Sequence, residues 1–92
     1  MRDERNDFAE ILGSKGKTKI LLLLAKHGQL NITRIVRYSG LHYNLVKKHL
    51  EDLLSLGLVE EQRIGKIRIF SLKFDNPKVP LLLELIRSLE DI

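Results

Sequence analysis

Residues 31–72 constrain the fold of this chain more than any other stretch. Apolar residues recur at helical spacing before Gly40 and again over residues 42–56. Asn31 is a favourable N-cap for the first segment, and Gly40 can take the positive φ angle that a sharp turn requires. The pattern predicts a short helix, a tight turn and a second, longer helix. Their buried stripes should be Ile32, Ile35 and Val36 in the first helix, and Val46, Leu50 and Leu53 in the second.

A two-stranded hairpin is expected directly after this helix pair. Gly57 ends the second helix, and residues 59–63 and 67–72 are short strand-like runs joined through Ile64-Gly65-Lys66. Phe70 and Leu72 should face the core. Ile67 and Ile69 have the opposite parity, so both faces of this strand are apolar, which contact with a terminal helix would explain. A helix pair followed by a hairpin is a compact way to present one helix to a DNA groove.

Further helices are expected before this unit. Residues 3–12 have the spacing of a short amphipathic helix, and Ser14 is a suitable N-cap for a helix from Lys15 to His27 that Gly28 ends. The apolar run in this second helix covers most of its circumference, so we expect neighbours on more than one side. Ile20, Leu21 and Leu24 should face the core, whereas Leu22 and Leu23 should meet a terminal helix or a second subunit.

The C-terminal segment predicts a contact between subunits. A helix from about Pro80 to Ile92 is expected, because proline is acceptable in a first helical turn. Folding of its apolar stripe back onto its own domain is the alternative. A core built from 92 residues is small, which favours a dimer that buries additional apolar surface. The expected dimer interface follows the 3-4-3 spacing of a short coiled-coil seam and includes one N-terminal residue: Leu82, Leu85, Leu89, Ile92 and Phe8.

The charge of the chain is concentrated in its middle. Residues 13–73 carry twelve basic and four acidic side chains, a net charge of +8, whereas residues 1–12 and 74–92 each carry a net charge of −2. The basic excess therefore lies on the helix pair and hairpin, where a polyanion would bind.

Several kinds of chemical site are disfavoured. The absence of cysteine excludes disulfides, thiolate metal sites and cysteine nucleophiles. Gly16-Lys17-Thr18 resembles the end of a phosphate-binding P-loop, but Ile11 stands where that motif needs a glycine. The three histidines share no metal-ligand spacing, and His49 is better explained as a partly buried structural residue. With no nucleophile–base pair either, we expect no enzyme activity, no cofactor and no metal.

The N-terminus is charged rather than apolar, and the longest apolar run, residues 20–25, is far too short to cross a membrane. We therefore expect a cytoplasmic protein associated with the nucleoid.

The combined pattern resembles the winged helix-turn-helix transcription regulators, in particular the small dimeric ArsR and MarR groups of bacteria and archaea. It covers about 60 of the 92 residues, from Lys17 onward. The resemblance implies a single domain, mainly α with a small β-hairpin, in which residues 14–73 form the core and wing, and residues 1–12 and 80–92 form dimerisation helices. The matching positions are Ile35-Val36, Ser39-Gly40-Leu41, Val46, Lys48-His49-Leu50, Leu53, Gly57-Leu58-Val59, Gly65 and Phe70-Ser71-Leu72.

The sequence departs from these groups in three ways. His42 stands where many relatives have a serine or threonine cap, the cysteine pairs of the metal-sensing relatives are absent, and the terminal helices do not resemble a ligand-binding domain. A small-molecule effector is therefore not indicated.

The expected mode of binding places the 42–56 helix in the major groove and the 59–72 wing on the backbone or in the minor groove of double-stranded DNA. Asn44 can pair with adenine, Lys47 can donate to guanine, and Tyr43 can pack on a thymine methyl or reach a phosphate. Each lysine could instead be merely solvated, and Tyr43 could cover the rim of the core. The expected phosphate and wing contacts are Lys48, Arg37, Lys15, Lys17, Arg63, Lys66 and Arg68.

These observations favour a homodimeric regulator that reads a palindromic site, with recognition helices about one DNA turn (~34 Å) apart. An architectural protein that coats DNA with low sequence specificity is the second hypothesis. A winged-helix protein-interaction module is the third, because such domains also serve in assembly.

Overall fold

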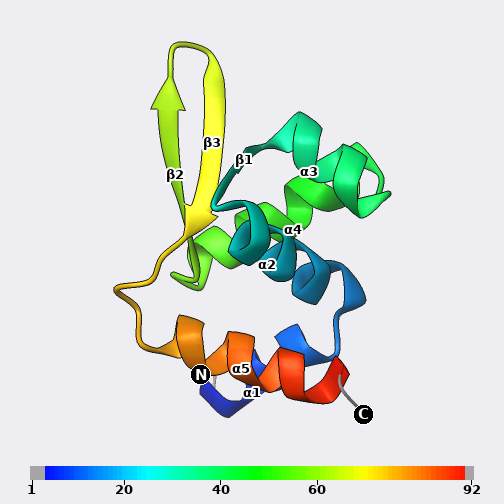
Figure 1. Ribbon diagram of the computed structural model, residues 1–92, viewed down its shortest axis with the longest axis vertical. Helices are drawn as coiled ribbons and strands as arrows, with labels where there is room; N and C mark the ends of the chain where they lie inside the picture. The colour runs from blue at the N-terminus through cyan, green and yellow to red at the C-terminus, as the bar shows by residue number, and fades with distance from the viewer. Residues whose placement is uncertain (1–3, 91–92) are drawn as a thin grey trace.

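The computed structural model describes residues 4–90, with side chains from Phe8 onward. Figure 1 shows a projecting hairpin and α3 towards one end of the molecule, α2 and α4 in the middle, and α1 and α5 at the other end. This is the expected winged helix-turn-helix fold, mainly α with a small β component. In order, the elements of the described range are α1 (Glu4–Leu12), α2 (Lys15–His27), β1 (Gln29–Asn31), α3 (Ile32–Ser39), α4 (Tyr43–Ser55), β2 (Val59–Ile64), β3 (Ile67–Leu72) and α5 (Lys78–Glu90).

The helix boundaries follow from the capping residues. The Ser14 Oγ accepts a hydrogen bond from the backbone N–H of Lys17 at 3.2 Å, and the Asn31 Oδ1 accepts one from Arg34 at 2.9 Å. Gly40 ends α3 with a φ angle of 72°, as the turn required. His42, at the N-cap of α4, makes no side-chain capping hydrogen bond in the described range, consistent with its departure from serine or threonine.

The sheet contains a strand that the sequence did not predict. The order is β1-β3-β2, and both pairings are antiparallel. In β1, Leu30 lies opposite Phe70, and Asn31 lies opposite Ile69. β1 lies beside β3 in the plane of the sheet, so this pairing does not itself cover the apolar second face of β3, on which Ile69 is half-buried. Ile67 lies nearer the tip of the wing and is 52% exposed.

The core lies around α2. Ile20, Leu21 and Leu24 are buried, as expected, and Leu22 and Leu23 pack half-buried against the same core. The other elements contribute Ile11 from α1, Leu30 from β1, Ile35 from α3, Val46, Leu50 and Leu53 from α4, Leu58 and Val59 at the start of the wing, Phe70 and Leu72 from β3, and Val79, Leu82, Leu83 and Ile86 from α5.

The expected coiled-coil seam on the C-terminal helix needs correction. Leu82 is only 1% exposed within its own chain, because positions 79, 82, 83 and 86 form the stripe that packs against the core. For Leu82, the alternative that the helix folds back onto its own domain is therefore correct. Leu85 and Leu89 remain 40% and 57% exposed, and Leu81 joins them at 51%. Phe8 packs half-buried against the core, and Ile92 lies outside the described residues.

Among residues 4–90 there is no helix with the length and apolar character needed to span a bilayer.

Candidate nucleic-acid interface

The N-terminal half of α4 presents polar side chains to solvent. Its apolar stripe faces the core, which turns the residues between the stripe positions outward. Tyr43 is 51% exposed, and Asn44, Lys47 and Lys48 are exposed as well. These are the four α4 residues that the sequence predicted for DNA contact, and they are available for it.

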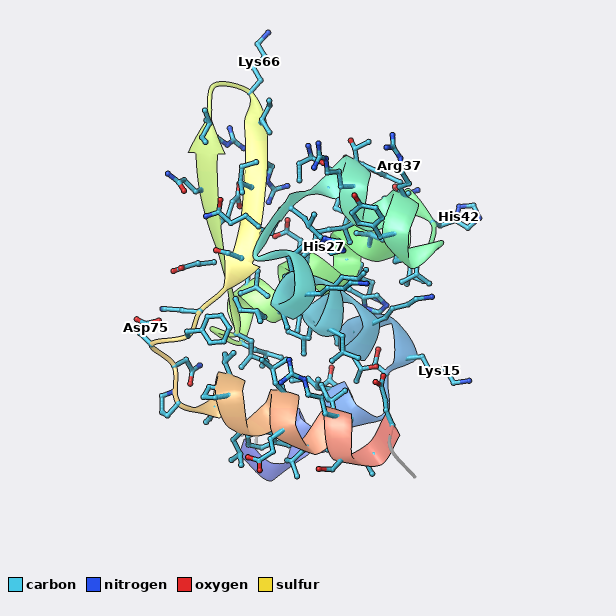
Figure 2. The ribbon with its side chains drawn as sticks, in the orientation of Figure 1. Lys15, His27, Arg37, His42, Lys66 and Asp75 are labelled. Carbon is cyan, nitrogen blue, oxygen red and sulfur yellow. The ribbon has the colours of Figure 1, made fainter. Side chains whose placement is uncertain are left out.

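The wing adds basic side chains at the end of the molecule that also holds α3. β2 and β3 pair along their whole length, with Ile64 opposite Ile67, and Gly65 takes a φ angle of 62° in the turn. Arg63 and Lys66 are exposed. Figure 2 shows Lys66 projecting from the tip of the hairpin.

An open cleft, here called the wing cleft, lies between the wing and the helix pair. Tyr43 from α4 and Lys66 from the wing share it, so α4 and the wing border one concave surface. Such a surface is suited to a strand of the sugar–phosphate backbone, since its rim carries a cation and a hydroxyl donor. The wing cleft is lined by Asn31, Ile32, Thr33, Tyr43, Lys66, Ile67 and Arg68.

Other predicted phosphate contacts differ in position. Arg37 is exposed on α3, and Figure 2 shows it in the same half of the molecule as Lys66. Lys15 is also exposed, but Figure 2 places it well away from the wing tip, at the start of α2. Lys15 therefore belongs to a different part of the surface from the wing cleft.

The structure corrects the expectation for Lys17. This lysine is only 7% exposed, and its Nζ lies 3.3 Å from the Asp52 Oδ2. It therefore ties α2 to α4 and is not presented to a DNA phosphate. The cause is its position one turn from the buried Ile20, on the face of α2 that meets α4.

The structure also corrects the expectation for Arg68. Its guanidinium donates to both Glu61 carboxylate oxygens, at 2.6 and 2.9 Å, and to the Glu51 Oε1 at 3.1 Å. It also lies 5.1 Å from the centroid of the Phe70 ring. The hydrogen bond to Arg68 holds the pKa of Glu61 below its usual value, and the two carboxylates raise the pKa of Arg68. Arg68 is thus committed to protein partners.

His49 belongs to a tight junction between α2 and α4. It is half-buried, as the sequence predicted, and its Nδ1 is buried without a hydrogen-bond partner in the described part of the chain. Burial lowers its pKa from 6.5, Lys17 and Lys48 lower it further, and Asp52 opposes the shift. A side chain on Gly16 would overlap the imidazole ring. Among the side chains that the structure describes, from Phe8 to Glu90, no three His, Asp or Glu residues gather as a metal site.

Sequence reasoning missed the partners in these contacts. Glu51 and Glu61 were not singled out, although they neutralise Arg68, and neither was the stacking of His27 on Tyr38 with ring centroids 4.7 Å apart. Opposite charges on the second helix and the hairpin were the available signal. Their pairing, however, depends on how the elements pack.

Comparison with known proteins gives structural matches only. No protein-family model and no curated protein sequence matches the chain. The AntR antimony-specific transcriptional repressor superposes with a TM-score of 0.81 and is 23% identical over 96% of this chain and 78% of its own. A possible transcriptional regulatory protein from Mycobacterium bovis is 26% identical over 94% of both chains, with a TM-score of 0.72.

A solution structure from the same organism adds a functional description. It is a homodimeric winged helix-turn-helix DNA-binding domain of a possible ArsR-family transcriptional regulator, 26% identical, with a TM-score of 0.74. The match covers 91% of this chain and 75% of that one. By its fold, this chain is a winged helix-turn-helix protein, and its structural matches show that it resembles the ArsR-family transcription regulators.

Proposed function

We propose that this protein is a DNA-binding transcriptional regulator that acts as a homodimer on a palindromic site. The observation that carries the proposal is the shared position of Tyr43 and Lys66 on the wing cleft. A helix that can read bases and a hairpin that can bind phosphates thus border one surface. The net charge of +8 on residues 13–73 gives that part of the chain the sign that DNA attracts.

In this proposal α4 reads the major groove. Asn44 donates to and accepts from adenine, Lys47 donates to guanine, and Tyr43 packs on a thymine methyl or reaches a phosphate. The support is that all three side chains are exposed in the first turns of α4, the part of a recognition helix that meets base edges.

The wing and its surroundings hold the backbone. Arg63 and Lys66 lie on the exposed part of the hairpin, and Arg37 and Lys48 add charge from α3 and α4. Such contacts fix the orientation of the protein on the duplex but carry no sequence information themselves. Lys15 would reach only a phosphate outside the wing cleft, so we assign it a minor part.

The dimer is proposed to form through α5. Leu81, Leu85 and Leu89 recur every four residues and are 51%, 40% and 57% exposed. This stripe is symmetric about Leu85. In an antiparallel pair of α5 helices, Leu85 would therefore meet its own copy, and Leu81 would meet Leu89, as a two-fold interface requires. Phe8 and Ile92 remain proposed flanking contacts. The homodimeric Mycobacterium bovis domain supports a dimer for this fold.

The test is a titration of labelled duplexes of several different defined sequences at several salt concentrations, with sedimentation of the free protein. We expect a dimer that binds DNA, with an affinity that falls steeply as salt rises, because each neutralised phosphate contributes about 0.9 to the slope. Identical affinity for every sequence would support the architectural hypothesis instead. Absence of binding even at low salt would refute the proposal and favour a protein-interaction module.

A further inference from the structure

We infer that Arg68 is a positioning residue, which holds the wing at a fixed angle to α4 without touching DNA. Glu61 and Glu51 are the two groups through which it acts. The inference rests on the proposed function, because it concerns how the wing and the reading helix are held together. It assigns a role to two carboxylates that otherwise oppose DNA binding by their charge.

The link is built from three elements. In the β2–β3 register, Arg68 lies opposite Arg63 and Glu61 lies opposite Phe70, so Arg68 and Glu61 are diagonal neighbours on one face of the hairpin. The Arg68 Nε and Nη2 engage both oxygens of Glu61, and Nη2 also reaches the Glu51 Oε1 of α4 at 3.1 Å. A planar guanidinium suits this double role, because its donors point in several fixed directions.

The outer part of the wing needs such a link. β1 pairs with β3 only from Ile69 to Ser71, so the hairpin beyond Ile69 is a two-stranded ribbon. A two-stranded ribbon has little stability of its own and twists easily. Arg68 lies just beyond the last residue that β1 supports, and its contact with Glu51 joins the ribbon to the helix at that level.

Arg68 borders the wing cleft, but the carboxylates that hold its guanidinium argue against a direct phosphate contact. Its side chain is 27% exposed, whereas that of Arg63 on the opposite strand is 68% exposed. A phosphate would have to replace two carboxylates that Arg68 already neutralises. Arg63 lies at the longer distance of 3.9 Å from the Glu61 Oε2 and stays largely exposed, and Lys66 is exposed at the wing tip. We therefore assign DNA contact to Arg63 and Lys66 and positioning of the wing to Arg68.

The test asks whether removal of a negative charge strengthens or weakens DNA binding. Glu51→Ala removes a negative charge near the proposed DNA surface, so simple electrostatics predicts tighter binding. If Glu51 holds the wing through Arg68, binding weakens instead, by about two- to fivefold, the range typical of a partly exposed ion pair. The matched control is Glu60→Ala, which removes the same charge from an exposed position on β2.

The salt dependence of DNA affinity distinguishes a residue that positions the wing from one that contacts a phosphate. Arg68→Ala should weaken binding with an unchanged salt slope, whereas Lys66→Ala should reduce the slope by about one. The double variant of Glu51→Ala and Arg68→Ala should bind no more weakly than Arg68→Ala alone. The inference is overturned if Glu51→Ala binds at least as tightly as the natural protein, or if Arg68→Ala reduces the slope as Lys66→Ala does.

Failure of the proposed function would give a different result, namely no binding by the natural protein itself. The inference is then decided by urea unfolding of the same single and double variants without DNA. If the effects of Glu51→Ala and Arg68→Ala on the free energy of unfolding are non-additive, the two residues interact, and the link between wing and helix is supported. Additive effects overturn it.

Discussion

Replacement of Gly16 by alanine gives the most direct measure of the α2–α4 junction. A Cβ at this position would overlap the Nε2 of His49 and lie 2.7 Å from its Cδ2. Replacing a glycine within a helix by alanine stabilises the helix by roughly 0.5–1 kcal/mol. Overpacking of a tight contact costs about 1–3 kcal/mol. The overpacking should prevail, because the buried Nδ1 side of the ring leaves the imidazole little room to withdraw.

We therefore expect Gly16→Ala to lower the free energy of unfolding by up to about 2.5 kcal/mol, the difference of the two effects. In a His49→Ala background the ring is absent, so the same substitution should stabilise the protein by about 0.5–1 kcal/mol. Thermal unfolding followed by circular dichroism measures both, since 1 kcal/mol shifts Tm by about 4–8 °C in a domain of this size. A rise in Tm in the natural background, or the same sign in both backgrounds, would refute the reasoning.

Asn44→Ala should reduce discrimination between DNA sites by ~1–3 kcal/mol, whereas Lys66→Ala should weaken all sites alike, and identical behaviour in a binding competition would contradict the division between reading helix and wing. Leu85→Asp should convert the dimer to a monomer in sedimentation, whereas Ile64→Asp, at an exposed wing position, should leave the dimer intact; a dimeric Leu85→Asp protein would place the interface elsewhere. Because burial lowers the pKa of His49, the unfolded chain binds more protons near pH 6.5, so stability should fall as the pH decreases from 7.5 towards and below 6.5. His49→Gln should lose less stability in the same urea series, and an equal loss would show that other groups cause it.

The helix-turn-helix and the hairpin could be predicted because local chemistry determines them. Gly40, Gly57 and Gly65 all take positive φ angles, of 72°, 74° and 62°, at the three places where the chain must turn. The apolar stripe of α4 is short and bounded by charged residues, so its phase was unambiguous. The exposure of the α4 residues that we propose to face DNA followed from that phase.

β1 and the phase of α5 could not be predicted with the same means. β1 has three residues, too few to show an alternating pattern, and it exists because β3 pairs with it. In α5, leucines occupy positions 81, 82, 83 and 85, so more than one helical face is apolar. Only packing against the core decides that Leu82 and Leu83 are buried and that Leu81 and Leu85 are exposed.

The roles of Lys17 and Arg68 were mispredicted for a related reason. A basic side chain in a basic region resembles a DNA contact until its partner is known. Asp52 and Glu51 lie on a different element from the cations they bind, and the fold alone brings them together. The distribution of charge in the sequence therefore showed where the basic residues concentrate, but not which of them are already paired within the fold.

Selection of binding sites from a random duplex library at moderate salt shows whether α4 reads a DNA sequence. We expect enrichment of an inverted repeat whose half-sites are centred about 10 base pairs apart, or a multiple of that spacing, because two α4 helices related by a two-fold axis would read it. Retained binding without any enriched sequence would contradict the claim that α4 reads bases.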